Sequence, residues 1–206
     1  MTQNPIEVIL FDLGNVILPF NHYQIAEKLF RFSNRKGVKD PQSIFSYLFD
    51  LEKGAINDYE TGRESSLEFF QDLKEHLQLT LSFEEFIPIW NDIFWENVEV
   101  SEMIRSLKGR NRLGLISNTN PLHFEYILKK FPVIRIFDKW ILSHEVGSKK
   151  PDVLIFQKAV DWASVEPKKI LLIDDMKTHV ETAISLGMQG IHFISADQLK
   201  KELDLK

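Results

Sequence analysis

The chain of 206 residues contains no cysteine. Disulfide bonds, thiolate metal sites and a cysteine nucleophile are therefore excluded. No run of Lys and Arg concentrates positive charge, and the formal net charge is -5, so the electrostatic footprint of a nucleic-acid-binding protein is missing. A small molecule is the better expectation for the ligand.

Long apolar runs are missing as well. The apolar stretch that follows residues 1–5 is interrupted at Asp12, far short of the length that a membrane span needs. We expect a cytoplasmic protein that binds neither membrane nor nucleic acid, as a monomer or a weak homodimer. Hydrophobic residues make up 44% of the chain and charged residues 27%, which favours a folded domain over a disordered chain.

Short apolar runs recur along the chain and are typical of buried strands. They cover residues 8–11, 112–117, 139–143, 169–174 and 190–194. Between the later runs, apolar residues such as Phe124, Ile127 and Phe131 have helical spacing. This alternation predicts an α/β fold, a doubly wound parallel sheet with helices on both faces. In such a sheet, ligands bind at the carboxyl ends of the strands.

Helix starts are expected directly after the strands. Pro121 and Pro151 should each open a helix, because proline suits the first helical position. Thr178 and Glu181 have the spacing of a capping box, and Gly187 should end the helix that they begin.

Residues 20–95 break the alternation, because their apolar residues have helical spacings only, as in Ile25 and Leu29 or Phe86 and Trp90. We predict two domains. Residues 1–19 and 96–206 form the catalytic core, and residues 20–95 form a small all-helical cap inserted after the first strand. The cap would lie over the ligand end of the sheet.

Polar residues follow four of the predicted strands and should converge at one edge of the sheet. They are Asp12, Ser117, Asn118, Lys150, Asp174 and Asp175. Each alone is more often a turn or cap residue, but the combination indicates a site. The adjacent carboxylates of Asp174 and Asp175 repel each other unless a cation compensates them. A site of oxygen ligands without cysteine favours magnesium over zinc.

Four segments carry a family resemblance. Phe11–Val16, Leu115–Asn120, Lys149–Asp152 and Ile173–Asp175 resemble, in order and spacing, the four motifs of haloacid dehalogenase-like hydrolases. The similarity spans nearly the whole chain, including the cap segment Tyr59–Arg63. Within the family it leans toward bacterial sugar-1-phosphate phosphatases of the alpha-D-glucose-1-phosphate phosphatase type.

The resemblance implies that Asp12 attacks phosphorus and forms a covalent aspartyl-phosphate, which water then hydrolyses. It also implies a Mg²⁺ cofactor held by the Asp12 carboxylate, the Gly14 backbone carbonyl and Asp175. Asp174 is either a further metal ligand or a supporting residue. A carboxylate that approaches a phosphate to ~4 Å faces repulsion of roughly 4 kcal/mol per charge pair at an effective dielectric near 20. The cation would offset that repulsion.

The other motif residues are assigned by the same resemblance. Lys150 supplies positive charge in the transition state, which leaves Lys149 exposed to solvent. Ser117 binds a phosphate oxygen through its hydroxyl, and the backbone near Asn118 contributes N–H donors.

Position 14 departs from the family pattern, because phosphatases of the family usually carry there an aspartic acid that protonates the leaving group. The substrate could have a leaving group that needs less help, such as an anomeric sugar phosphate, which is the interpretation we favour. Another group could instead supply the proton. Candidates for this proton donor, or for contacts to the sugar, are Asn15, Asn21, His22 and Glu60, although residues of these types are more often loop or surface residues.

The function predicted from the sequence is that of a magnesium-dependent phosphatase acting on a small phosphomonoester, such as a sugar-1-phosphate. Two alternatives stay open. A catalytically degenerate relative would use its cap as a binding module. A haloacid dehalogenase would direct the same aspartate against carbon without magnesium, which would leave Asp174 and Asp175 without a cation.

Overall fold

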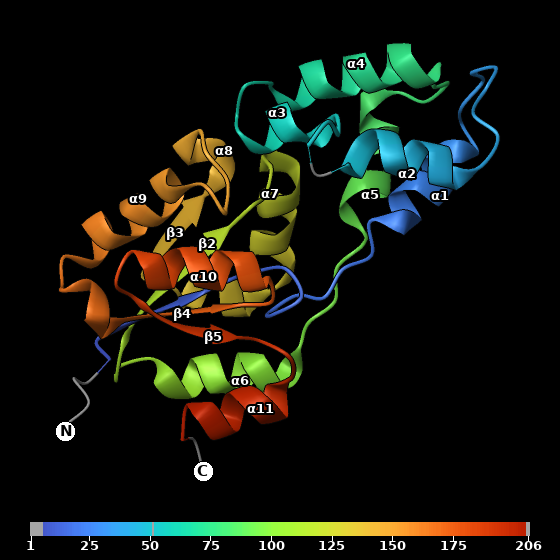
Figure 1. Cartoon of the computed structure of the whole chain (residues 1–206). Helices are drawn as coiled ribbons and strands as arrows, with labels where there is room; N and C mark the ends of the chain where they lie inside the picture. Colours follow the sequence, from blue (N-terminus) through green and yellow to red (C-terminus); the bar gives the residue numbers. More distant parts are fainter. Residues whose placement is uncertain (1–5, 51, 205–206) are drawn as a thin grey trace.

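A computed structural model describes residues 6–50 and 52–204 of the chain. One parallel sheet of five strands forms its core, in the order β3-β2-β1-β4-β5 (Figure 1). The strands are β1 (Val8–Phe11), β2 (Arg112–Ser117), β3 (Lys139–Leu142), β4 (Ile170–Asp174) and β5 (Gln189–His192). All the predicted strands are present, each within a residue or two of its expected limits.

Strand β1 lies at the centre of the sheet and is buried along its whole length. Ile9 and Phe11 belong to the hydrophobic cluster on one face of the sheet, whereas Val8 and Leu10 belong to the cluster on the other. Side chains of a strand alternate between faces, so a strand covered on both faces must be apolar throughout. This explains the uninterrupted apolar run before Asp12.

Helices cover both faces of the sheet. The cluster around Ile9 includes residues of α6 (Val98–Leu107), α7 (Pro121–Lys130) and α11 (Ala196–Glu202). The opposite cluster includes residues of α9 (Val153–Ala163) and α10 (Lys177–Ser185). The short helix α8 (Ser143–Val146) follows β3, and 3-10 turns occupy Pro132–Ile136 and Pro167–Lys169. The predicted doubly wound α/β fold is confirmed.

Two of the predicted helix starts are wrong. Helix α9 begins at Val153, and Asp152 caps it by accepting a hydrogen bond from the Leu154 N–H at 2.8 Å; Pro151 lies before the helix. Helix α10 begins at Lys177 without any side-chain cap, so Thr178 and Glu181 form no capping box. The third predicted helix start is confirmed, because α7 begins at Pro121.

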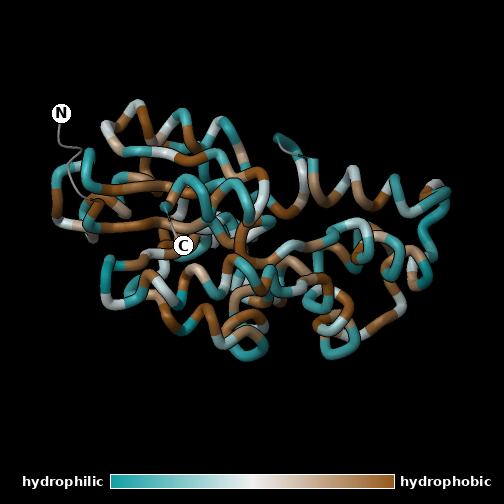
Figure 2. The backbone as a smooth tube through the Cα atoms, turned by 90° about the horizontal axis from the view of Figure 1, so that it is seen from below, coloured by the Kyte–Doolittle hydropathy of each residue, from teal (hydrophilic) through white to brown (hydrophobic). Residues whose placement is uncertain are grey.

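Residues 20–95 contain the helices α1 (Tyr23–Phe30), α2 (Pro41–Phe49), α3 (Ile56–Glu60), α4 (Ser66–Leu77) and α5 (Phe83–Asn91). In the described part of this segment no strand occurs, as predicted. The helices enclose a hydrophobic cluster of their own, centred on Trp90, Phe69 and Phe86. Figure 2 shows apolar segments running through the interior of both parts, with hydrophilic segments at the outer turns. The apolar pattern did not identify α2 and α3.

Two chain segments connect these helices to the sheet and run beside each other. The Trp95 N–H donates to the Pro19 carbonyl at 3.0 Å, and the Asn97 N–H donates to the Ile17 carbonyl at 2.9 Å. The helical segment consequently lies beyond the carboxyl ends of the strands (Figure 1). Residues 1–5 and 205–206 of the predicted core lie outside the described residues. Within the described part, no helix is long and apolar enough to cross a membrane.

Candidate active site

Asp12 lies at the carboxyl end of the central strand. Its N–H donates to the Ile173 carbonyl of β4 at 2.9 Å, which continues the sheet and fixes the backbone of Asp12 beside the end of β4. Asp174 and Asp175 follow at that end. Carboxylate oxygens of Asp12, Asp174 and Asp175 all lie within 4.8 Å of one another. The predicted convergence of the three acidic residues is therefore present in the structure.

Lys150 bridges two of these carboxylates. Its Nζ donates to Asp12 Oδ1 at 2.7 Å and to Asp174 Oδ2 at 2.6 Å, and the lysine side chain is only 1% exposed. The Asn118 side chain holds the backbone of Lys150 in place. Asn118 Oδ1 accepts from the Lys150 N–H at 2.7 Å, and its Nδ2 donates to the Lys150 carbonyl at 2.9 Å. Asn118 thereby positions the buried cation.

Burial controls the protonation of this cluster. Burial raises the pKa of Asp12 well above its usual range, against the opposing charge of Lys150, and the nearby Asp174 and Asp175 raise it further. Burial also acts to raise the pKa of Asp174, but Lys150 and the hydrogen bond from His179 outweigh it and hold that pKa below the usual range. One lysine cannot neutralise three carboxylates, so a further cation bound here would favour the ionised form of Asp12.

The donor set suits magnesium. Asp174 Oδ1 accepts hydrogen bonds from the Met176 N–H and from His179 Nδ1, both at 2.9 Å, while its other oxygen binds Lys150. Both oxygens of Asp174 are thus committed within the protein. Asp175 is partly exposed, and its Oδ2 accepts a single hydrogen bond from Asn15 Nδ2 at 2.9 Å. Carboxylates and a backbone carbonyl, with room for water, are the ligands that magnesium prefers.

A cavity of about 540 Å³ opens above these residues. Its wall combines core residues with residues of the helical segment. It includes Asp12, Gly14, Asn118, Lys149, Lys150, Asp175 and His179 from the core, and Phe20, His22, Phe49, Asp50, Asn57 and Glu60 from the helical segment. Of the predicted site residues, Ser117 and Asp174 are buried and do not line the cavity. The Ser117 hydroxyl contacts the neighbouring Asn118 carbonyl at 3.4 Å.

Comparison with protein-family models identifies the family. The model described as haloacid dehalogenase-like hydrolase matches residues 47–193. The chain belongs to this family of hydrolases. The predicted family and its enzymatic character are therefore confirmed.

Three relatives resemble this hydrolase over nearly its whole length. A D-ribitol-5-phosphate phosphatase of Bacteroides thetaiotaomicron is 25% identical over 205 residues, which cover 96% of this chain and 97% of the relative. A flavin mononucleotide hydrolase of Arabidopsis thaliana is 26% identical, with coverage of 98% and 78%. The crystal structure of a haloacid dehalogenase family enzyme from Bacteroides thetaiotaomicron, in complex with magnesium and inorganic phosphate, has a TM-score of 0.79 at 25% identity, with coverage of 90% and 93%.

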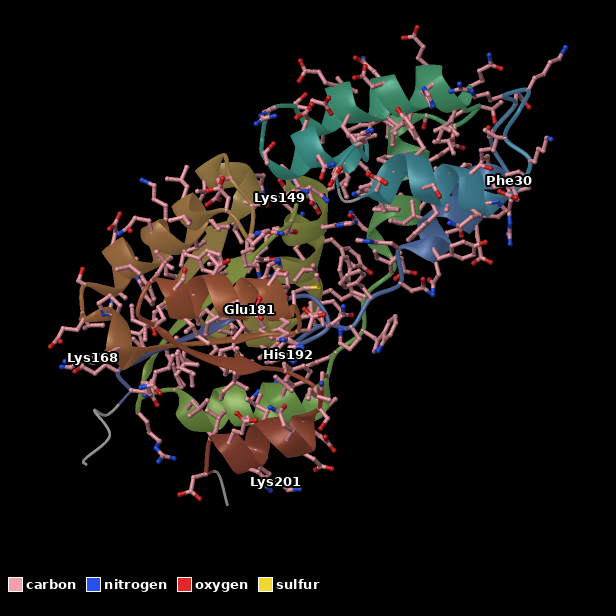
Figure 3. The ribbon with its side chains drawn as sticks, viewed as in Figure 1. Phe30, Lys149, Lys168, Glu181, His192 and Lys201 are labelled. Atoms are coloured by element: carbon pink, nitrogen blue, oxygen red, sulfur yellow. The ribbon has the colours of Figure 1, made fainter. Side chains whose placement is uncertain are left out.

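The prediction that Lys149 of this hydrolase is exposed to solvent is wrong. The side chain is 28% exposed, and its Nζ donates a hydrogen bond to Asn57 Oδ1 and lies 3.8 Å from Glu60 Oε2. Figure 3 places Lys149 where the core faces the helical segment. The adjacent lysines therefore point to different places, Lys150 into the carboxylate cluster and Lys149 toward helix α3.

Sequence reasoning missed two contacts in the hydrolase site. His179 was assigned no role, yet it binds Asp174 from the first turn of α10. Asn15 adopts a left-handed backbone conformation with φ of 54°, and its amide reaches Asp175. The signal that could have found His179 was its position, because a helix that begins at Lys177, two residues after Asp175, turns its first side chains back toward the end of the strand.

Proposed function

We propose that the chain is a magnesium-dependent phosphatase that hydrolyses a small phosphomonoester, with Asp12 as the nucleophile. The observation that carries this proposal is the arrangement around Asp12. Its carboxylate lies at the floor of a cavity, pairs with a buried lysine at 2.7 Å and lies beside two further carboxylates. The relatives named as a D-ribitol-5-phosphate phosphatase and a flavin mononucleotide hydrolase, and the related structure with magnesium and phosphate, support the same chemistry.

The proposed reaction has two steps. An Asp12 carboxylate oxygen attacks phosphorus, the bond to the alcohol oxygen breaks, and an aspartyl-phosphate forms. Water then attacks phosphorus, and Asp12 leaves as a carboxylate. Lys150 holds Asp12 in place and offsets the negative charge that accumulates on the phosphoryl oxygens.

Asp12, Asp175 and the Gly14 carbonyl are proposed to hold the magnesium ion, with Asp174 as a support for Lys150 and His179 rather than a direct ligand. Magnesium would supply the second positive charge that the three carboxylates require. The backbone N–H groups near Asn118, which lines the cavity, are proposed to donate hydrogen bonds to the phosphate oxygens. Ser117 is proposed to join them by turning its buried hydroxyl from the Asn118 carbonyl toward the cavity.

The two-domain division is part of the proposal. Residues 20–95 are proposed to act as a cap that closes the cavity above the core and selects the alcohol. Phe20, His22 and Phe49 form an aromatic wall, in which the His22 ring stacks on Phe49 with centroids 4.2 Å apart. Such a wall can pack against the apolar face of a sugar ring or a carbon chain.

The substrate is proposed to be the phosphate ester of a sugar or polyol, such as a sugar-1-phosphate. Flavin mononucleotide and D-ribitol 5-phosphate, after which two relatives are named, are both phosphate esters of a ribityl chain. A cavity of about 540 Å³ has room for a molecule of this size.

Phosphate release from a panel of sugar phosphates, polyol phosphates and 4-nitrophenyl phosphate tests this function. We expect release that requires magnesium and that falls by at least about 1000-fold in Asp12→Asn. The order of rates across the panel would identify the alcohol. Absence of release from every ester would contradict the proposal and favour a noncatalytic binding role.

A further inference from the structure

The space beside Gly14 is closed to the aspartic acid that usually protonates the leaving group in this family. A Cβ atom at position 14 would lie 2.7 Å from Cε1 of the Phe20 ring, closer than side-chain carbons normally approach. The Phe20 ring therefore lies against the position that the Cβ atom of the missing acid would take. If the leaving alcohol receives a proton from the protein, the donor lies elsewhere on the cavity wall.

Most titratable groups on that wall are unsuited to this task. Asp50 accepts N–H groups of Lys53 and Glu52 at 2.8 and 3.0 Å, which lowers its pKa and keeps it ionised. His179 is bound to Asp174. Burial lowers the pKa of His22 to about 4, so this ring is neutral at physiological pH.

Glu60 differs from all of them. It ends helix α3, its side chain is 14% exposed, and it lines the cavity. Among the described residues no group donates a hydrogen bond to its carboxyl oxygens, and the nearest cation is Lys149 at 3.8 Å. Burial raises the pKa of Glu60 to about 7, against the opposing charge of Lys149. The carboxyl group is therefore available to the cavity and partly protonated near neutral pH.

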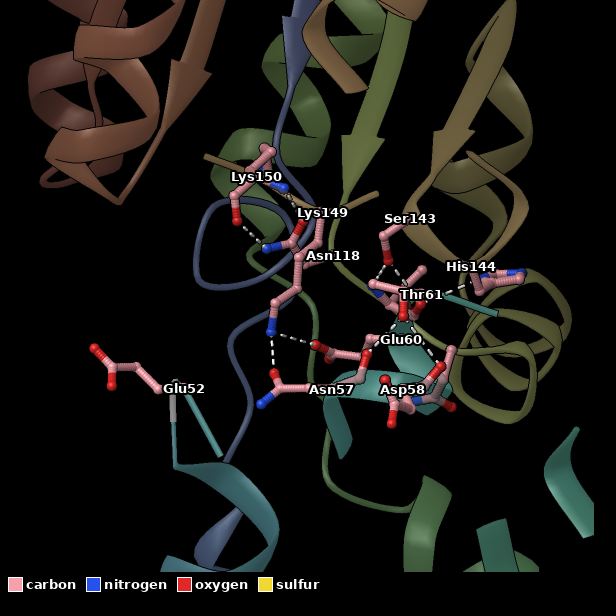
Figure 4. Close-up of polar contacts among 12 residues, drawn as sticks. Glu52, Asn57, Asp58, Glu60, Thr61, Asn118, Ser143, His144, Lys149 and Lys150 are labelled. Atoms are coloured by element: carbon pink, nitrogen blue, oxygen red, sulfur yellow. Dashed lines mark hydrogen bonds and ion pairs between the residues drawn. The ribbon is translucent and has the colours of Figure 1, made fainter. Parts of the chain in front are cut away.

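The turn that follows Glu60 is fixed against the core. Gly62 has a φ of +69°, and a Cβ atom there would lie 2.1 Å from the His144 carbonyl oxygen of α8. Figure 4 shows Lys149 reaching toward Asn57 and Glu60, with Thr61 and His144 next to them. The end of α3 is thus held over the carboxyl ends of the strands, on the side where Lys149 meets the cap.

The other charged groups around α3 are directed elsewhere. Asp58 pairs with Arg63 at 2.9 Å, and His144 Nδ1 contacts the Thr119 carbonyl at 3.0 Å. Glu68 of α4 closes a capping box with the Ser65 N–H. Lys149 is consequently the charge that faces the Glu60 carboxyl group.

We infer that Glu60 is the acid that protonates the departing alcohol oxygen, from the cap rather than from position 14. The inference rests on the proposed function. As Asp12 attacks and the P–O bond breaks, the Glu60 proton passes to the alkoxide oxygen and gives the free alcohol. The carboxylate that remains is stabilised by Lys149. In the second step it takes a proton from the attacking water, which restores the acid as phosphate is released.

The leaving group provides the test. Glu60→Gln keeps the size of the side chain but cannot deliver a proton. We expect its kcat/KM on a sugar or polyol phosphate to fall by about 100-fold or more. On 4-nitrophenyl phosphate, whose phenolate departs without a proton, we expect a fall of less than about 10-fold. Asp58→Asn, on the same helix but outside the cavity, should change neither rate.

The pH profile gives an independent readout. Since Lys149 lowers the pKa of Glu60, the Lys149→Met variant should move the alkaline limb of kcat/KM for the alkyl ester to higher pH. The limb should be absent in Glu60→Gln. Equal losses on both esters in Glu60→Gln, or an unmoved limb in Lys149→Met, would overturn the inference while leaving the phosphatase proposal intact. Wild-type protein without turnover of either ester would overturn both.

Discussion

At the scale of single residues, the geometry of the site depends on residues that orient its charged side chains through hydrogen bonds. Lys150 reaches two carboxylates because Asn118 fixes its backbone, and Asp174 keeps its orientation because His179 and the Met176 N–H bind it. Hydrogen bonds that orient metal-binding residues also affect metal affinity. The loss of one commonly weakens metal binding by roughly 10- to 100-fold.

His179→Ala should therefore raise the magnesium concentration that gives half-maximal phosphatase activity by about 10-fold. The loss of one donor lets the Asp174 carboxylate rotate and disturbs Lys150. Magnesium titration of initial rates measures this effect. His76→Ala, in the cap and stacked on Tyr47, is the control. Identical magnesium curves for His179→Ala and wild type would show that Asp174 needs no support.

Gly14→Ala should lower the free energy of unfolding by about 1–3 kcal/mol, because its methyl group would collide with the Phe20 ring. Phe20→Leu removes the ring edge, so the double variant should lose less than the sum of the single losses. Urea denaturation of the two single variants and the double variant gives the coupling. Additive losses would mean that Phe20 does not occupy the space beside Gly14.

The residues at the strand ends were predictable because parallel strands bring their carboxyl ends to one edge of the sheet. The order of the strands and the residues that follow them was therefore enough to predict that Asp12, Lys150 and the acidic pair lie together. The separate directions of Lys149 and Lys150 were not predictable. They depend on the path of the loop that Asn118 holds, which is a contact between residues 32 positions apart.

At the scale of helices and strands, two sets of contacts join residues 20–95 to the helices that flank the sheet. The glycine turn after α3 packs against α8, and a hydrogen-bond network joins α5 to α7. In that network, Trp90 Nε1 donates to Asn120 Oδ1 at 3.3 Å, and His123 Nε2 donates to the Trp90 carbonyl at 3.0 Å.

Gly62→Ala should destabilise the protein more than Gly109→Ala, by about 1 kcal/mol or more. Both glycines have positive φ, at +69° and +86°, but only Gly62 has an atom of another residue within 4 Å of its missing Cβ. Gly109→Ala thus measures the backbone strain alone. Equal losses in urea denaturation would show that the contact with α8 does not constrain the turn.

Acid should weaken the link between α5 and α7. His123 is buried, and burial lowers its pKa to about 3. Because the unfolded histidine, with a pKa near 6.5, binds a proton first, the stability due to the neutral ring is complete above pH ~6.5 and is lost as the pH falls toward 3. As the pH falls, the free energy of unfolding should decrease less steeply in His123→Gln than in the wild type. The two slopes should differ by up to about 1.4 kcal/mol per pH unit. Urea denaturation at a series of pH values measures this difference. Parallel plots of unfolding free energy against pH for the two proteins, between roughly pH 7 and 5, would contradict it.

The sequence predicted an element correctly where all of its side chains are buried. The strands were identified because a central parallel strand is apolar at every position, as β1 is. Helix α3 was missed because it has only five residues and two buried side chains. Helix α2 is as long as α5, but only two of its side chains, Ile44 and Leu48, are buried, so its apolar pattern is weak. The capping box predicted at Thr178 failed because Asp174 already binds the Met176 N–H just before the helix.

At the scale of the whole molecule, the sheet part and residues 20–95 each have a hydrophobic cluster, and residues of both line one cavity. In the proposed mechanism, the residues around the sheet supply the nucleophile, the buried lysine and the carboxylates, whereas residues 20–95 supply the aromatic wall and Glu60. The sequence could predict that residues 20–95 form an all-helical segment, from the helical spacings alone. It could not predict which cap side chains face the site, because that depends on how the two parts pack.

The central claim is that Asp12 carries the phosphoryl group. Rapid quenching of the magnesium-activated protein during turnover, followed by mass spectrometry of the peptide that contains Asp12, tests it most directly. We predict one added phosphoryl group on Asp12 in the wild type, and neither this adduct nor turnover in Asp12→Asn. Turnover by Asp12→Asn at the wild-type rate, or a phosphoryl group trapped on another residue, would contradict the account.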